Sequence, residues 1–215
     1  MIESVRSKWE EFPELQTCHH FVYDSEYRKG NNKVLFMGIN PGEVKADWEN
    51  HPNGRCEESM HFNFRKNYPL PLNSKKWFNL VNDLIPEKHG IIQSELFFWS
   101  SNNLTELKKR IPNWSNGPIM NFCVLANQWI IKERKIKIVI VSGVGQIKLI
   151  SKLYNLKLTN KIFDEQNRRL VEIYISNQGI KWLFTLHLTS TRGLTNISKN
   201  NIKKIIHEQC KLINN

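Results

Sequence analysis

The sequence contains few of the residues that build metal sites and crosslinks. Only four of its 215 residues are cysteine, and no two of them form a Cys-x-x-Cys pair. A zinc ribbon and a disulfide framework are therefore not expected. No apolar run is long enough to span a membrane, and the charged N-terminus does not resemble a secretion signal. These absences predict a soluble, cytoplasmic protein with no metal or other cofactor.

Acidic side chains are also scarce relative to basic ones. Lys and Arg contribute 31 residues against 20 Asp and Glu, which gives a net charge of +11. A globular chain this basic often binds a polyanion such as nucleic acid, although a solvated Lys-rich surface gives the same balance. The length suits one domain over residues 1–215, which we expect to act as a monomer.

Short apolar runs alternate with helical patterns along the chain. Strands are predicted at residues 33–39, 94–99, 136–142, 170–175 and 181–186, and helices at residues 4–12, 74–85, 115–135, 146–154 and 198–213. This order predicts an α/β fold with a central, largely parallel sheet of about four to five strands between two helical layers. Ligands of such sheets bind at the carboxyl ends of the strands. The loops that begin at Gly38, Trp99, Ser142 and Leu186 are therefore expected at one edge.

The first of these loops reads Gly38-Ile39-Asn40-Pro41-Gly42. Its two glycines permit a tight turn and a close approach of a ligand to the backbone. The amide of Asn40 both donates and accepts hydrogen bonds, so it can hold and aim a water molecule. An ordinary Asn-Pro-Gly turn has the same sequence.

A later loop, residues 187–195, leaves the last predicted strand and reads HLTSTRGLT. Its hydroxyls, backbone amides and Arg192 suit phosphate contacts, and Leu194 suits insertion into a base stack. Alternatively, His187 is a strand-end histidine with its hydrogen bonds satisfied, and Leu194 is the first apolar residue of the last helix.

Together, the two loops resemble those of the uracil-DNA glycosylase superfamily. The GINPG loop matches the version in its mismatch-specific uracil and thymine glycosylase branch, and HLTSTRGLT keeps the His and a later Gly-Leu of the family's second loop. SELFFWSSNN and IVIVSGVGQ resemble two intervening segments in the same order. The resemblance implies a three-layer α/β/α fold and a monofunctional DNA glycosylase, which hydrolyses the N-glycosidic bond of a flipped-out modified or damaged pyrimidine and leaves an abasic site.

The resemblance also implies roles for individual residues. Asn40 would position the water and His187 would stabilise the departing base. The base pocket would use the first-loop residues Gly38, Ile39, Pro41 and Gly42. An aromatic ring after this loop, Trp48, Phe62 or Phe64, would stack on the base, and the amide of Asn102 or Asn103 would read its edge. Asn102 or Asn103 could instead cap a helix starting near Thr105. The predicted contacts with double-stranded DNA are Ser142, Gly143, Gly145, Ser190, Thr191, Arg192, Gly193 and Leu194, with Leu194 or Arg192 as the wedge.

The sequence is also compatible with other functions. A phage-restricting branch of the superfamily removes glucosylated hydroxymethylcytosine, and the unusual region at residues 43–72 makes this base a candidate substrate. A basic nucleic-acid-binding module without activity would explain the charge. A nucleotide-binding enzyme using Gly143-Val144-Gly145 lacks a complete phosphate-loop motif. A lyase with a Schiff-base lysine is a further alternative.

Overall fold

The structure, a computed structural model, describes residues 2–18, 26–42, 79–187 and 195–212, and these form an α/β fold around one sheet. Its strands are β1 (Glu26–Arg28), β2 (Asn32–Gly38), β3 (His89–Glu95), β4 (Ile138–Ser142), β5 (Lys157–Phe163), β6 (Arg169–Ile175) and β7 (Lys181–Thr185). The helices are α1 (Ile2–Glu11), the 3-10 helix η1 (Pro13–Thr17), α5 (Leu104–Arg110), α6 (Pro118–Glu133), α7 (Ile147–Leu153) and α8 (Asn196–Lys211), with a further helical stretch at residues 79–84.

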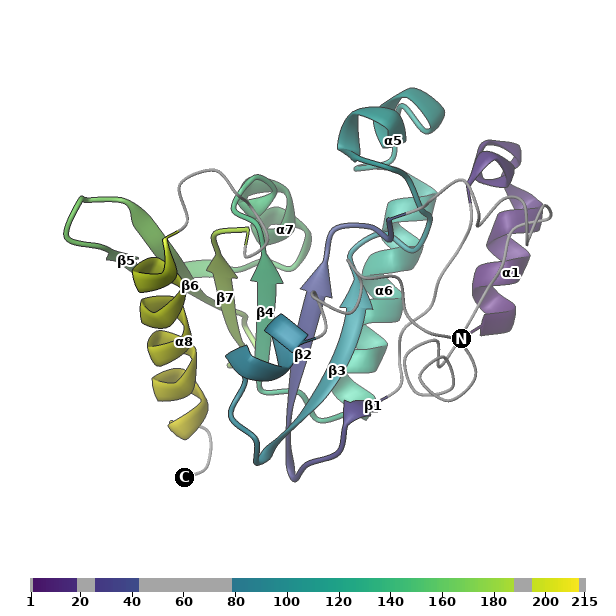
Figure 1. Ribbon diagram of the computed structural model, residues 1–215. Coiled ribbons are helices and arrows are strands. Elements are labelled where there is room, and N and C mark those ends of the chain that lie inside the picture. The colour runs from purple at the N-terminus through teal and green to yellow at the C-terminus, as the bar shows by residue number, and fades with distance from the viewer. Residues whose placement is uncertain (1, 19–25, 43–78, 188–194, 213–215) are drawn as a thin grey trace.

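The sheet has a parallel centre and antiparallel margins. The strand order is β1-β3-β2-β4-β7-β6-β5, and the four central strands β3, β2, β4 and β7 run parallel. β1 joins antiparallel on one side, and β6 and β5 join antiparallel on the other. The predicted fold class is therefore confirmed, although the seven strands exceed the four to five expected from the sequence (Figure 1).

Helices cover both faces of the sheet. Because side chains alternate along a strand, Leu35 and Val139 point to one face, where they pack with α1, α6 and α7. Phe36 and Ile140 point to the other, where they pack with α8 and the helical stretch at residues 79–84. Figure 1 shows α8 on one side of the sheet and α6 on the other. Burial on both faces explains why these strands are continuous apolar runs.

One predicted strand is misplaced. The sequence predicted a strand at residues 94–99, but β3 spans His89–Glu95. The ladder to β2 pairs Asn32 with His89 and ends where Gly38 meets Glu95. Beyond Glu95 the chain continues as an irregular segment whose apolar side chains, from Leu96 to Trp99, fill the core. The apolar run SELFFW therefore reflects burial rather than strand pairing.

The other elements follow the predictions closely, apart from two strands. β1 and β5 were not predicted from the sequence, and β5 is exposed along most of its length. The helix predicted over residues 74–85 is described only from residue 79, and it ends before Pro86. Within the described residues, no helix is long and apolar enough to cross a membrane.

Candidate functional site

The carboxyl ends of the central strands form one edge of the sheet, as predicted. Gly38 is in register with Glu95 at the end of β3, and Ser142 is in register with Thr185 at the end of β7. The ends of β2, β3, β4 and β7 stand together in Figure 1. The loops that leave these strands at Gly38, Ser142 and Leu186 therefore start side by side.

The first loop lies against the segment that follows β3. The backbone N–H groups of Leu96 and Phe97 donate to the carbonyls of Gly38 and Ile39, both at 2.9 Å. The N–H of Ser101 then donates to the carbonyl of Pro41 at 3.1 Å. The two segments stay paired beyond the regular ladder, and this holds the loop in place.

The side chain of Asn40 is fixed by the same segment. Its amide nitrogen Nδ2 donates to Ser101 Oγ at 2.9 Å and to the carbonyl of Pro41 at 2.9 Å. Ser101 Oγ in turn donates to the carbonyl of Asn103 at 2.8 Å. Both amide hydrogens thus have partners, while Asn40 Oδ1 accepts none of the hydrogen bonds recorded between described residues. The site therefore presents a half-buried acceptor oxygen at the strand ends.

Gly38 makes room for a carboxyl group that the sequence analysis did not single out. The carboxyl carbon of Glu95 lies 2.7 Å from the point that a Cβ on Gly38 would occupy, so a larger residue at position 38 would displace this carboxyl group. Glu95 is 7% exposed, and its Oε2 has no hydrogen-bond partner. Burial raises the pKa of Glu95 to about 8, against a lowering by a hydrogen bond from the Gln93 side chain. Glycine at a strand end was the available sequence signal for such a close approach.

The second pair of loops meets at Gly143 and His187. The N–H of Gly143 donates to the carbonyl of Thr185 at 2.9 Å, and Gly143 has a φ of 108°, a conformation that favours glycine. The ring carbon Cδ2 of His187 lies 3.7 Å from the point that a Cβ on Gly143 would occupy. Desolvation lowers the pKa of His187 below its ordinary value. This shift favours the neutral imidazole, which can donate a hydrogen bond, over the imidazolium at pH 7.

Asn40 and His187 belong to two separate contacts at this edge. β4 lies between β2 and β7, so the loops that carry them start two strand spacings apart, roughly 10 Å. The structure therefore holds Asn40 against Ser101 and places the His187 ring near Gly143, on loops that leave different strands.

Several predicted site residues have structural roles. Ile39 packs against the core and Pro41 is buried, whereas Gly42 is exposed. Asn103 caps α5, because its Oδ1 accepts from the N–H of Glu106 at 3.0 Å, so the capping alternative is confirmed for this residue. Asn102 is exposed.

The predicted DNA contacts near β4 also differ in exposure. Ser142 is 4% exposed and its hydroxyl has no hydrogen-bond partner. The side chain of Ser142 is thus buried, and its predicted contact with DNA stays a prediction. Gly145 is exposed and Gly143 is partly buried. The predicted residues Trp48, Phe62, Phe64, Ser190, Thr191, Arg192, Gly193 and Leu194 lie outside the described residues.

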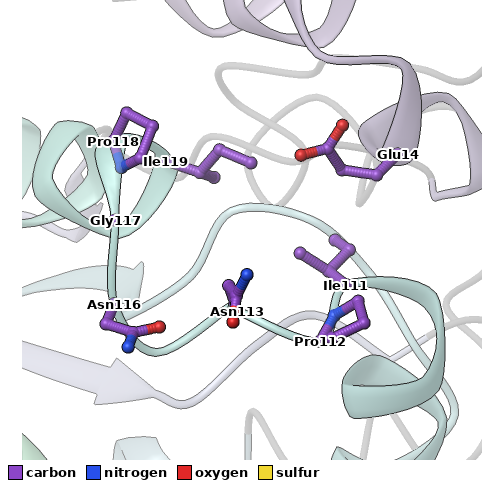
Figure 2. Close-up of a pocket in the computed structure, with 8 residues that line it drawn as sticks. All are labelled: Glu14, Ile111, Pro112, Asn113, Asn116, Gly117, Pro118 and Ile119. Atoms are coloured by element: carbon purple, nitrogen blue, oxygen red, sulfur yellow. The ribbon is translucent and has the colours of Figure 1, made fainter.

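A hollow of about 440 Å³ lies elsewhere, between η1 and the connection from α5 to α6 (Figure 2). Glu14 faces Ile111 and Ile119 across it, and Asn113 and Asn116 line its polar side. No residue of the two loops lines this hollow. Over the described ranges, no group of three His, Cys, Asp or Glu side chains is arranged to hold a metal ion.

Comparison with family models finds no match to this chain, and comparison with curated proteins finds none either. A function for this chain is therefore inferred from the chemistry of the residues at the strand ends and from the resemblance of the two loops.

Proposed function

We propose that the chain is a monofunctional DNA glycosylase that hydrolyses the N-glycosidic bond of a modified or damaged pyrimidine. The observation that carries the proposal is the anchored amide of Asn40. With Nδ2 held by Ser101 and Pro41, its Oδ1 is oriented as a hydrogen-bond acceptor. An acceptor at this position can hold a water molecule and aim its oxygen at a sugar carbon.

The chemistry also requires stabilisation of the departing base, which leaves with negative charge. His187 is a described group of the second loop that can supply a donor. With its pKa lowered, its ring is neutral and carries one N–H. The spacing between the loops of β2 and β7 would let one nucleoside reach both Asn40 and His187. A DNA duplex buries this bond, so the nucleotide would be rotated out of the stack.

Charge supports DNA as the partner. The net charge is +11, and one face of α8 carries Lys199, Lys203, His207 and Lys211 at intervals of four residues. Residues at this spacing lie above one another on a helix. Lys203 and Lys211 are exposed, so the row is available to phosphates of a nucleic acid.

The test is release of a base from DNA of defined composition. Duplexes with a single uracil, mismatched thymine, hydroxymethylcytosine or glucosylated hydroxymethylcytosine are incubated with the full chain. Strand cleavage after alkali then reports abasic sites. Asn40→Ala should lower the rate by at least about 100-fold, and Asn121→Ala, at an exposed position on α6, should leave it unchanged.

The outcome also separates the rival functions. Tight DNA binding without base release from any of the duplexes would favour a non-catalytic binding module. Borohydride trapping of a protein–DNA adduct would contradict the monofunctional mechanism in favour of a lyase. Release of only the glucosylated base would support a role in defence against phage.

A further inference from the structure

Glu95 is a buried acid whose carboxyl group is only partly satisfied by a hydrogen bond from the Gln93 side chain. It stands at the end of β3, 7% exposed, and its Oε2 has no hydrogen-bond partner. A buried carboxyl oxygen without a partner is costly for the fold. Gly38 leaves the space that this carboxyl group occupies. Gly38 thus makes room for a carboxyl group that has an unpartnered oxygen. This combination indicates a group retained for chemistry.

The carboxyl group lies beside the loop that holds Asn40. Residues 95–101 supply both the carboxyl at Gly38 and the hydroxyl that anchors Asn40. Because Gly38 and Asn40 are two residues apart, their Cα atoms are separated by at most about 7 Å. Two hydrogen bonds through one water molecule span roughly 5–6 Å. The Glu95 carboxyl at Gly38 therefore lies close along the chain to Asn40, and the role proposed below requires one water shared by the two side chains.

A second unpartnered group lies in the same row across the sheet. Ser142 follows Val141, which is in register with Met37, so Ser142 stands beside Gly38 on the strand opposite Glu95. Its hydroxyl is buried and has no hydrogen-bond partner. Alternation along the strands directs Ser142, like Glu95, to the α8 face of the sheet. Two buried polar groups thus flank Gly38 from neighbouring strands.

The proposed reaction creates a proton that Asn40 cannot accept, because an amide is a very weak base. We propose that Glu95 is the proton acceptor for the attacking water, an inference that rests on the proposed glycosylase function. The water oxygen bonds to C1′, and the C1′–N bond breaks with its electron pair on the base. The released proton passes to Glu95 Oε2 and from there to the departing base or to solvent.

The ionisation of Glu95 gives this role a measurable signature. Its pKa of about 8 follows from burial, with the Gln93 amide as the opposing group, and no charged group among the described residues shifts it further. A general base acts only when ionised. Base release by the wild-type chain should therefore rise about tenfold per pH unit below pH 8 and level off above it.

The experiment measures single-turnover base release against pH for the full chain. Glu95→Gln keeps the size of the side chain but cannot accept the proton, so its rate should fall by about 10²–10⁴-fold and lose the rise toward pH 8. Glu172→Gln is the matched control, because Glu172 is a buried carboxyl on β6, 2% exposed and paired with Arg169. This control should keep the wild-type pH profile.

A second variant tests the role without removing the carboxyl group. Gly38→Ala places a methyl group where the Glu95 carboxyl lies, so its rate should also fall. A wild-type rate that declines above pH 8 overturns the role as a base, and so does a Glu95→Gln variant with the wild-type rate and profile. Wild-type protein that releases no base overturns the glycosylase function itself. Activity that depends on Asn40 but not on Glu95 overturns only this inference.

Discussion

The hydroxyl of Ser101 holds the side-chain amide of Asn40, since Asn40 Nδ2 donates to Ser101 Oγ at 2.9 Å. The hydroxyl is itself oriented by its hydrogen bond to the carbonyl of Asn103. Ser101 therefore acts through Asn40 and is a positioning residue.

We expect Ser101→Ala to lower kcat for base release about 5–10-fold with little change in KM, because one neutral hydrogen bond contributes about 1 kcal/mol. Steady-state kinetics on the preferred duplex measures both constants. Ser101→Thr, which keeps the hydroxyl, should restore most of the rate. Ser94→Ala is the control, since it removes a buried serine that donates to Asn127 on α6. A matching loss in that control would assign the effect to stability.

Gly143 should be intolerant of a side chain. Its φ of 108° strains any L-residue, so we expect Gly143→Ala to destabilise the fold by about 1–3 kcal/mol. Gly145→Ala, two residues along the same turn, has open space at its Cβ position and should cost far less. Urea unfolding of both variants gives the comparison. Equal stability of the two variants would show that the conformation at Gly143 carries no strain.

Asn103 is expected to act as a helix cap. Asn103→Ala removes the acceptor for the N–H of Glu106 and should destabilise the protein by about 1 kcal/mol, while the preference among modified bases stays unchanged. Asn102→Ala, at the exposed neighbouring position, should leave stability unaltered. Thermal unfolding and the duplex panel measure the two properties. If Asn103→Ala changes the base preference but not the stability, Asn103 reads the base and does not act mainly as a helix cap.

Glu95 should make stability depend on pH even without a substrate. Its pKa is raised from 4.5 to about 8 in the folded chain, so the folded state holds its proton more tightly than the unfolded state does. The wild-type chain therefore loses stability as pH rises from about 4.5 to 8. Glu95→Gln removes this dependence. Its free energy of unfolding should exceed that of the wild type by about 2–5 kcal/mol at pH 8.5.

Unfolding curves at several pH values test this expectation. The stability difference between Glu95→Gln and wild type should grow across that pH window. Parallel curves for Glu95→Gln and wild type would mean that Glu95 already ionises near its ordinary pKa in the folded protein.

The sequence predicted the central strands well because their burial leaves a simple pattern. Residues 33–39 and 136–142 are apolar runs, and they correspond to β2 and β4. The boundary of β3 was missed because apolar side chains continue past Glu95 into the core. β5 was missed because its sequence, KLTNKIF, is mostly exposed and has no clear apolar face.

The candidate site was predictable only in part. Asn40 and His187 could be chosen because each follows an apolar strand directly. Glu95 could not, because a single acidic residue before LFFW is typical of the solvent side of a strand. Its significance depends on the register between β3 and β2, which places it opposite Gly38. Register of this kind depends on contacts between residues far apart in the sequence.

The carbonyl of Pro41 accepts hydrogen bonds from both the Ser101 N–H and the Asn40 side chain. Folding of the backbone and orientation of the amide are therefore one event. The side chain therefore loses its conformational entropy when the protein folds, and not when DNA binds. Under the proposed function, such a preorganised site would need little rearrangement in the chemical step.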